Sequence, residues 1–259
     1  MGQGEAVLLD IDGVLTMDWK PIPGAVAAVR ELRADDVRYV LLTNTTSRTR
    51  RSIAGTLAEA GFPVGVECVL TAPAATADRL AGSRCLLLNS GDIREDLAGI
   101  ELVDDPDDAE IVLIGGAGPE LDYPALNRAF AALRGGARLV AMHRNAYWRT
   151  SEGLQLDSGA FVAGLEYAAG VRAEVLGKPA EAFFAGALAR LGVAAAEAVM
   201  VGDDIESDVL AAQRYGITGV LVHTGKAAPG APKRGSAEPD HELDSVASLP
   251  ELLSQLRQG

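Results

Sequence analysis

Two aspartates near the start of the chain have the type and spacing of a reactive pair. Asp10 ends a short hydrophobic run and Asp12 follows two residues later, so both side chains leave an extended strand on the same side. Gly13 then lets the backbone turn sharply and present amide groups to an anion. Two carboxylates this close repel each other unless a cation compensates them, and oxygen ligands of this kind suit Mg²⁺. The alternative is an ordinary aspartate-rich turn after a strand.

Polar side chains also follow two later hydrophobic runs. Thr43 and Asn44 end the run LLTN, and a hydroxyl and an amide at a strand end can hydrogen-bond phosphate oxygens. The same pair before a helix is also a common N-cap signal. Lys178, in the sequence Gly-Lys-Pro, would neutralise Asp10 and hold a phosphoryl group if the fold placed it nearby. A lone lysine in such a position is otherwise solvated surface.

A third acidic group follows the run AVMVG. Asp203 stands at the expected strand end and could bind the same cation. Asp208 lies four residues after Asp204, so we expect these two side chains on one helical face. The helix dipole alone also favours acids at a helix start, which explains Asp204 and Glu206 better than it explains Asp203.

Short hydrophobic runs alternate with alanine-rich helical stretches along the chain. This alternation predicts parallel α/β sheets with helices on their faces, and the carboxyl ends of parallel strands meet at one ligand-binding edge. We expect a surface loop over 226–241, which is rich in proline, glycine and alanine. The expected strands cover 6–10, 37–44, 84–89, 111–115, 138–142, 173–176, 198–201 and 219–222, and the expected helices start at Pro23-Gly24 and Ser47 and cover 72–81, 122–134, 159–169, 180–191, 205–215 and 248–257.

The composition limits the classes of partner. The 259 residues are 48% hydrophobic, which is enough for one large or two modest domains. The net charge of −13 disfavours nucleic acid and anionic membranes, and no hydrophobic run is long enough to span a bilayer. With no signal segment and only two cysteines, which we expect to be reduced, the sequence predicts a cytoplasmic protein without nucleic-acid or membrane partners. A phosphate substrate would need local positive charge.

Four motifs in one order, DIDGVLT, LLTNTT, GKP and VGDDIESD, resemble those of the haloacid dehalogenase-like hydrolase superfamily. The insert between the second and third resembles the cap of its nitrophenylphosphatase-like branch. The phrases FFAGALARLG, EAVMVGDDIESDV and VHTGK are most similar to the hydrolase-domain-containing-2 type and to phospholysine phosphohistidine inorganic pyrophosphate phosphatases. The resemblance spans at least 6–226. It implies a Rossmann-like parallel-sheet core domain at 1–74 and 173–259, with an inserted smaller α/β cap domain at 75–172.

The resemblance also implies an activity, that of a Mg²⁺-dependent phosphatase acting on a small phosphorylated metabolite through an aspartyl-phosphate. Asp10 would be the nucleophile and a metal ligand. Asp12 would be the general acid and base, and its backbone carbonyl would bind the metal. Asp203 would complete the protein's share of the metal ligands.

The remaining roles are implied in the same way. Thr43 and Asn44 would hold the phosphoryl oxygens, and Lys178 would bridge the phosphate and the nucleophile. Asp208 would orient Lys178 or a metal-bound water, and Asp204 is the less favoured alternative ligand. Homodimers that pair cap to cap are common among the resembling proteins, so the resemblance allows a homodimer without specifying the assembly.

Other chemistries on this scaffold are carbon–halogen cleavage, phosphonate cleavage and phosphoryl mutation. Dehalogenation does not need Asp12, and a phosphonatase needs a Schiff-base lysine from its cap, whereas 75–172 contains no lysine. A different class of function is that of a non-catalytic regulatory or binding protein that kept the fold. The intact Asp10, Asp12, Asp203 and Lys178 argue against it. The loop from His143 to Arg149 either contacts the leaving group of the substrate and selects it, or is a surface loop with one packed tryptophan.

Overall fold

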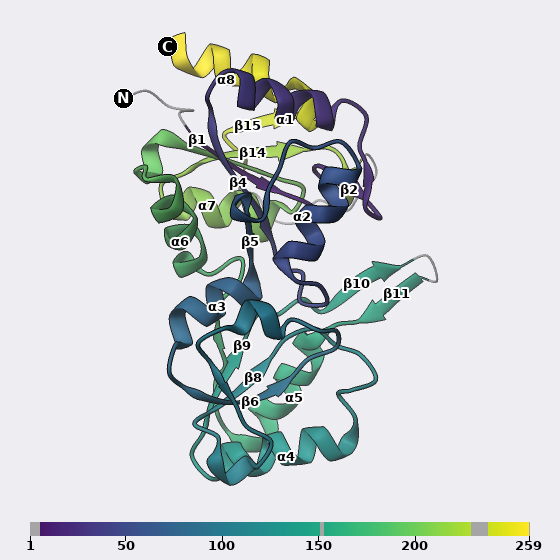
Figure 1. The fold of residues 1–259 in the computed structure, drawn as a ribbon, viewed down its shortest axis with the longest axis vertical. Helices are drawn as coiled ribbons and strands as arrows, with labels where there is room; N and C mark the ends of the chain where they lie inside the picture. Colours follow the sequence, from purple (N-terminus) through teal and green to yellow (C-terminus); the bar gives the residue numbers. More distant parts are fainter. Residues whose placement is uncertain (1–5, 151–152, 229–237, 259) are drawn as a thin grey trace. The chain divides into compact units, whose positions relative to one another are not determined.

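The computed structural model describes residues 6–150, 153–228 and 238–258, with the backbone alone at 148–150. The chain forms two compact units (Figure 1). The first combines Met1–Thr43, Arg50–Leu70 and Lys178–Gly259, and the second combines Asn44–Thr49 and Thr71–Gly177. Within the described residues, no helix is both long and apolar enough to cross a membrane.

The first unit contains a six-stranded sheet in the order β15-β14-β13-β1-β4-β5. β1 is buried along its whole length and runs parallel to both of its neighbours, β13 and β4. The carboxyl ends of these three strands therefore meet at one edge. The strands are β1 (Ala6–Asp10), β4 (Arg38–Thr43), β5 (Val69–Thr71), β13 (Ala198–Gly202), β14 (Thr218–Val222) and β15 (His241–Leu243), with a small hairpin of β2 (Thr16–Met17) and β3 (Lys20–Pro21) after β1.

Helices of the first unit bury apolar stripes against this sheet. One core cluster joins α1, α2 and α8 to alternate strand residues such as Val7 and Leu9, because successive strand residues face opposite sides. α6 packs on β4, and α7 packs on β14. The helices are α1 (Ala25–Ala34), α2 (Arg50–Glu59), α6 (Glu181–Leu191), α7 (Ala211–Arg214) and α8 (Leu249–Gln258).

The second unit has its own five-stranded parallel sheet, in the order β12-β9-β8-β6-β7. One core cluster contains residues of α3, and a separate one contains residues of α4 and α5. A two-stranded hairpin, β10–β11, precedes α5. The elements are α3 (Ala72–Leu80), β6 (Arg84–Leu88), β7 (Glu101–Leu102), β8 (Ile111–Ile114), α4 (Tyr123–Arg134), β9 (Arg138–Ala141), β10 (Tyr147–Thr150), β11 (Gly153–Leu156), α5 (Ser158–Ala169) and β12 (Glu174–Val175).

The predicted α/β class is confirmed, with two local differences in the expected helices. The second helix begins at Arg50 rather than after Ser47, because 44–49 belongs to the second unit, where Asn89 Nδ2 donates to the Thr46 carbonyl at 3.0 Å. The expected helix over 205–215 is a π-helix over Ile205–Leu210 that continues into α7. Part of the expected surface loop, 229–237, lies outside the described residues. The predicted boundaries of the cap at 75 and 172 stay a prediction.

Candidate active site

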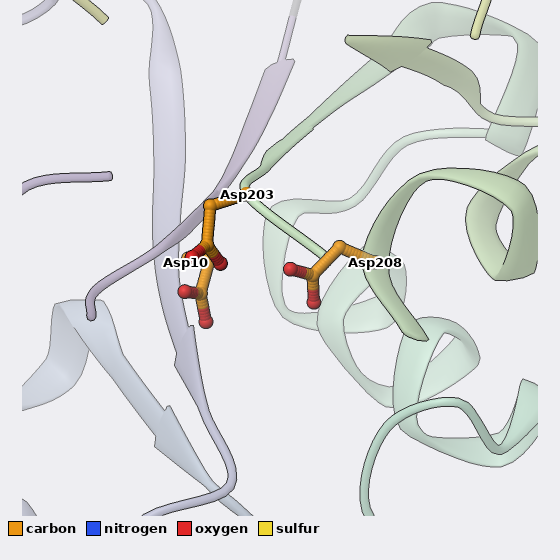
Figure 2. A group of neighbouring side chains, drawn as sticks. All are labelled: Asp10, Asp203 and Asp208. Atoms are coloured by element: carbon orange, nitrogen blue, oxygen red, sulfur yellow. The ribbon is translucent and has the colours of Figure 1, made fainter. Parts of the chain in front are cut away.

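The ends of two neighbouring strands place the first two acids. Asp10 is the last residue of β1, and Asp203 directly follows β13. β1 and β13 pair in parallel from Ala6 opposite Ala198 to Leu9 opposite Val201, so their carboxyl ends lie side by side. The two carboxylates converge at this edge, as Figure 2 shows.

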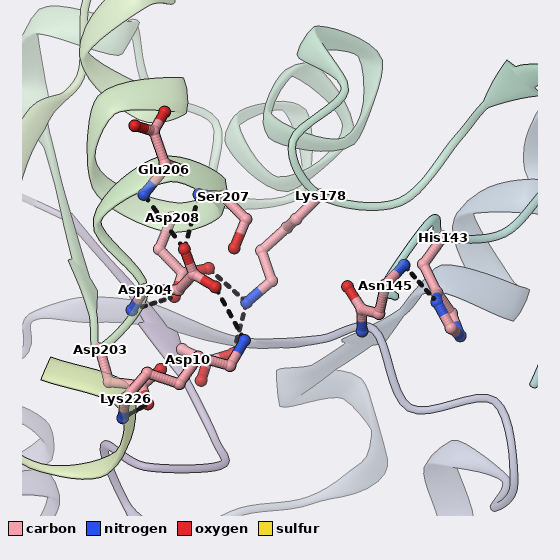
Figure 3. Close-up of polar contacts among 10 residues, drawn as sticks. All are labelled: Asp10, His143, Asn145, Lys178, Asp203, Asp204, Glu206, Ser207, Asp208 and Lys226. Carbon is pink, nitrogen blue, oxygen red and sulfur yellow. Dashed lines mark hydrogen bonds and ion pairs between the residues drawn. The ribbon is translucent and has the colours of Figure 1, made fainter. Parts of the chain in front are cut away.

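Asp208 completes a group of three buried acids. One carboxylate oxygen from each of Asp10, Asp203 and Asp208 lies within 4.8 Å of the others. Lys178 contacts two of the three (Figure 3): its Nζ donates to Asp10 Oδ1 and lies 2.6 Å from Asp208 Oδ1. All four residues are at most 6% exposed. The fold therefore brings three acids and one lysine from distant parts of the sequence together in one buried site.

Burial and mutual repulsion set the charges of this group. Burial raises the pKa of Asp10 well above its ordinary value, although Lys178 works in the opposite direction. Burial, assisted by Asp208, raises the pKa of Asp203 to about 7. For Lys178, burial alone would lower the pKa, but Asp10 and Asp208 outweigh it and raise that pKa above its ordinary value. One ammonium thus leaves the three acids under-compensated.

This donor set fits a hard divalent cation. Carboxylate oxygens are the ligands that Mg²⁺ prefers, and a cation would lower the cost of ionising acids whose pKa values burial has raised. Within the described part of the chain, Asp10, Asp203 and Asp208 are the group of potential ligands that comes this close together.

Asp12 lies in the turn that follows β1. Its side chain is exposed and stands outside the group of three described carboxylates that come within 4.8 Å. Partial desolvation and then the charge of Asp18 raise the pKa of its carboxyl. The turn is closed by the Gly13 N–H, which donates to the Thr16 carbonyl at 2.7 Å. Gly13 has φ +88°, and a Cβ there would lie 2.2 Å from Asp203 Oδ2, so only glycine fits beside that carboxylate.

The chain passes from the first unit to the second between Thr43 and Asn44. Thr43 is buried and ends β4, next to β1, where Asp10 is opposite Leu42. Asn44 is the first residue of the second unit, and its Oδ1 lies close to Gly177, where a Cβ would come within 2.7 Å of it. Lys178 is the next residue after Gly177 and begins the return to the first unit.

Asp204 lies just outside the helix that contains Asp208, so the two side chains do not share one helical face as expected. Asp204 is the N-cap of the π-helix, and its Oδ1 accepts the N–H groups of Glu206 and Ser207, both at 3.1 Å. Asp208 is buried and faces Lys178. The N-cap has an extended backbone, φ −103° and ψ 109°, so helical side-chain spacing does not apply to Asp204.

Thr224 and Lys226, in the loop after β14, contact site residues although the sequence predicts no role for them. Thr224 Oγ1 donates to the Gly13 carbonyl, the Lys226 N–H donates to Asp203 Oδ2 at 2.7 Å, and Lys226 Nζ donates to Asp204 Oδ2 at 2.8 Å. The sequence signal that could have indicated these contacts is the position of Thr-Gly-Lys, two residues after the end of a strand whose carboxyl end lies at the same edge.

The loop after β9 has a structural part that can be described. His143 is buried in the second unit, where its Nε2 lies 3.5 Å from Thr46 Oγ1 and its Nδ1 accepts the Asn145 N–H at 3.4 Å (Figure 3). Arg144 pairs with Glu166 on α5 through two hydrogen bonds of 2.9 and 2.6 Å. Tyr147 is exposed, and the side chains of Trp148 and Arg149 lie outside the described residues. The interpretation of this loop as a substrate reader stays a prediction.

Comparisons with known proteins give matches to two family models and to curated relatives. A family model described as haloacid dehalogenase-like hydrolase matches residues 7–102, and a second, described as HAD-hydrolase-like, matches residues 175–249. A phospholysine phosphohistidine inorganic pyrophosphate phosphatase from Rattus norvegicus is 36% identical, covering 96% of this chain and 94% of its own length.

Two further proteins extend the comparison to another relative and to a solved structure. Haloacid dehalogenase-like hydrolase domain-containing protein 2 from Rattus norvegicus is 38% identical, over 86% of this chain and 85% of its own. The structure of a p-nitrophenyl phosphatase from Archaeoglobus fulgidus superimposes with a TM-score of 0.90 at 28% identity, over 96% of this chain and 99% of its own.

Proposed function

The chain belongs to the haloacid dehalogenase-like hydrolase family, and from that premise we propose a Mg²⁺-dependent phosphatase that acts through an aspartyl-phosphate on Asp10. The phosphatase class is shared with its relatives. The metal, the residue roles and the substrate are the proposed parts. One observation carries them: Asp10, Asp203 and Asp208 lie together at a parallel-sheet edge, with Lys178 between two of them.

The proposed metal ligands are the carboxylates of Asp10 and Asp203 and the backbone carbonyl of Asp12. When bound, Mg²⁺ offsets the negative charge that the phosphate and the nucleophile bring together. Lys178 adds a second, fixed positive charge, and Asp208 holds its ammonium toward Asp10. Because Lys178 is already oriented and desolvated, it needs little reorganisation when charge develops on the phosphoryl oxygens.

Asp10 attacks phosphorus in line, so that an Asp10–phosphorus bond forms as the bond to the leaving oxygen breaks. Asp12 gives a proton to that oxygen, which its raised pKa favours, and then takes a proton from the water that hydrolyses the aspartyl-phosphate. Thr43 donates its hydroxyl and Asn44 its amide to the phosphoryl oxygens. Division into two displacements makes each step easier than direct attack by water.

The proposed substrate is a small phosphorylated metabolite, with inorganic pyrophosphate and phospho-amino acids as members of the panel to test. Relatives are named for phospholysine, phosphohistidine and inorganic pyrophosphate, and a structural neighbour for p-nitrophenyl phosphate. We further propose that the protein works in the cytoplasm, since the thiols of Cys68 and Cys85 are both free. A homodimer stays a prediction, which sedimentation of the full chain would test.

Hydrolysis of p-nitrophenyl phosphate with Mg²⁺ and with EDTA tests the proposal. We expect turnover with Mg²⁺, its loss in EDTA and its recovery when Mg²⁺ is restored. Asp10→Asn removes the nucleophile and should lower kcat at least about a thousandfold. Asp35→Asn, an exposed acid after α1, is the matched control and should keep wild-type turnover.

A covalent intermediate gives a second readout. After rapid acid quench, the peptide containing Asp10 should carry a phosphoryl group in the wild type and none in Asp10→Asn. Normal turnover by a folded, pure Asp10→Asn protein would refute the assignment. No turnover of any substrate in the panel by the wild type would favour a non-catalytic protein of the same fold.

A further inference from the structure

We propose that Gly225 and Lys226, which follow β14, are positioning residues of the metal site. In this proposal they hold the carboxylate of Asp203 in place and keep that of Asp204 away from the metal. The inference rests on the proposed function, because it concerns residues that act toward the expected Mg²⁺.

The backbone of the loop encloses the Asp203 carboxylate. The Lys226 N–H donates to Asp203 Oδ2 at 2.7 Å (Figure 3). Gly225 has φ +55°, and a Cβ there would lie 2.1 Å from the same oxygen, while a Cβ at Gly13 would lie 2.2 Å from it. The carboxylate therefore lies between two glycines, where any side chain would displace it. A ligand fixed this closely loses little freedom when it binds a metal.

The loop is tied to the strands on both sides of Asp203. Thr224 Oγ1 donates to the carbonyl of Gly13, in the turn after β1. On the other side, His223 Nε2 lies 2.7 Å from Glu242 Oε2 on β15. These contacts connect the carboxyl ends of β1, β14 and β15 around Asp203, so a displaced loop would move the ligand and the turn together.

The side chain of Lys226 acts on Asp204. Its Nζ lies 2.8 Å from Asp204 Oδ2, while Asp204 Oδ1 already caps the π-helix. Both oxygens of the Asp204 carboxylate therefore already have hydrogen-bond partners within the protein. The Asp204 N–H also donates to Asp208 Oδ2 at 3.2 Å, which links this cap to the acid group.

The loop backbone and the Lys226 ammonium should contribute unequally to metal affinity. The Lys226 side chain is 65% exposed, and exposed ion pairs are individually weak. The backbone contacts of Gly225 and Lys226 are partly buried and touch the proposed ligand directly. Displacing the backbone should therefore cost more metal affinity than removing the ammonium.

Calorimetric titration of the metal-free full chain with Mg²⁺ alone measures the Mg²⁺ affinity of each variant independently of its activity. Gly225→Ala should weaken Mg²⁺ binding about 10- to 100-fold, the range for groups that orient metal ligands. Gly192→Ala is the matched control: φ is +65°, but the nearest atom to a Cβ is 3.9 Å away, so it adds similar strain without crowding a ligand. It should bind Mg²⁺ as the wild type does.

A second set of variants separates positioning from metal ligation. Lys226→Ala and Asp204→Asn should each change Mg²⁺ affinity by at most about tenfold, and the double variant should change it by no more than the larger of the two single changes, because both substitutions remove one interaction. Asparagine still caps the π-helix. Lys226→Arg should restore binding, and Arg214→Ala, which removes an exposed charge from α7, should leave it unchanged.

The outcomes that contradict the inference are distinct from those that contradict the function. Wild-type Mg²⁺ affinity in folded Gly225→Ala, or a far larger loss in Asp204→Asn than in Lys226→Ala, overturns it. So does a raised KM in Lys226→Ala at unchanged Mg²⁺ affinity, which would indicate substrate contact. If Gly225→Ala does not fold, the Mg²⁺ affinities of the Lys226 and Asp204 variants test the positioning role instead. Failure of the wild type to bind Mg²⁺, or equal binding by Asp203→Asn, refutes the proposed function itself.

Discussion

Lys178 is the residue on which the charge balance of the site depends. Its ammonium is buried and contacts Asp10 and Asp208, with Asp203 close to both acids. Burial opposes its charge, but Asp10 and Asp208 outweigh burial and raise the pKa of Lys178 above its ordinary value, which favours the protonated form at neutral pH. A fixed cation next to the nucleophile lowers the repulsion that an incoming phosphate meets, and it does so without a proton transfer.

Lys178→Met tests this at the residue scale. The change keeps the length of the side chain and removes its charge, and we expect kcat for p-nitrophenyl phosphate to fall about 10²- to 10³-fold, as for other preorganised electrostatic groups. Lys178→Arg should restore little, because a planar guanidinium does not fit where a compact ammonium contacts two carboxylates. Lys20→Ala, at an exposed lysine in β3, is the control. A Lys178→Met protein with native circular dichroism and wild-type kcat would contradict the role.

At the scale of elements, the strand ends were predictable and the contacts between loops were not. Asp10 and Asp203 each follow a wholly buried run, so their place at the sheet edge follows from hydrophobicity and parallel topology. The burial of Asp208 depends on a π-helix, which no residue pattern marks. The contact between Gly13 and Gly225 joins turns of distant strands, and it depends on sheet order, which alternation alone does not specify. Short strands such as β5 and β7 have too few residues for any periodicity.

The attachment of α5 gives a prediction at the same scale. Glu166 is buried, accepts two hydrogen bonds from Arg144 and a third from the Ala173 N–H at 2.9 Å. Glu166→Gln should destabilise the second unit by about 1.5–3 kcal/mol, the range for hydrogen bonds to a charged group. Urea unfolding measures this, and faster hydrogen exchange of the Ala173 amide would localise it. Glu174→Gln, in an exposed pair with Arg138 at 3.4 Å, should change stability by less than about 0.5 kcal/mol.

The stability difference between the wild type and Glu166→Gln should depend on pH with a defined sign. Arg144 lowers the pKa of Glu166 in the folded protein, so the pair contributes its full stability above the unfolded value of about 4.3 and loses it as pH falls through the folded pKa. The stability gap between wild type and Glu166→Gln should therefore be constant near pH 7 and shrink below about pH 4. A gap that widens on acidification would contradict the assignment of this ion pair.

For the whole molecule, the distribution of lysine separates phosphate ester cleavage from phosphonate cleavage. The second unit, 44–49 and 71–177, contains no lysine. A phosphonatase of this architecture needs a cap lysine that forms a Schiff base with a carbonyl next to the carbon–phosphorus bond. Lys178 does not replace it, because its ammonium is buried, charged and held by two carboxylates, and only a neutral amine attacks a carbonyl.

We therefore expect no release of phosphate from a phosphonate that carries a neighbouring carbonyl, under conditions where p-nitrophenyl phosphate is hydrolysed. Sodium borohydride with that phosphonate should leave the phosphatase activity and the intact mass unchanged, because there is no imine to reduce. Release of phosphate from the phosphonate, together with a stable mass increase on Lys178 after reduction, would overturn this expectation. The same sample, assayed with Mg²⁺ before and after treatment, serves as its own control for damage by borohydride.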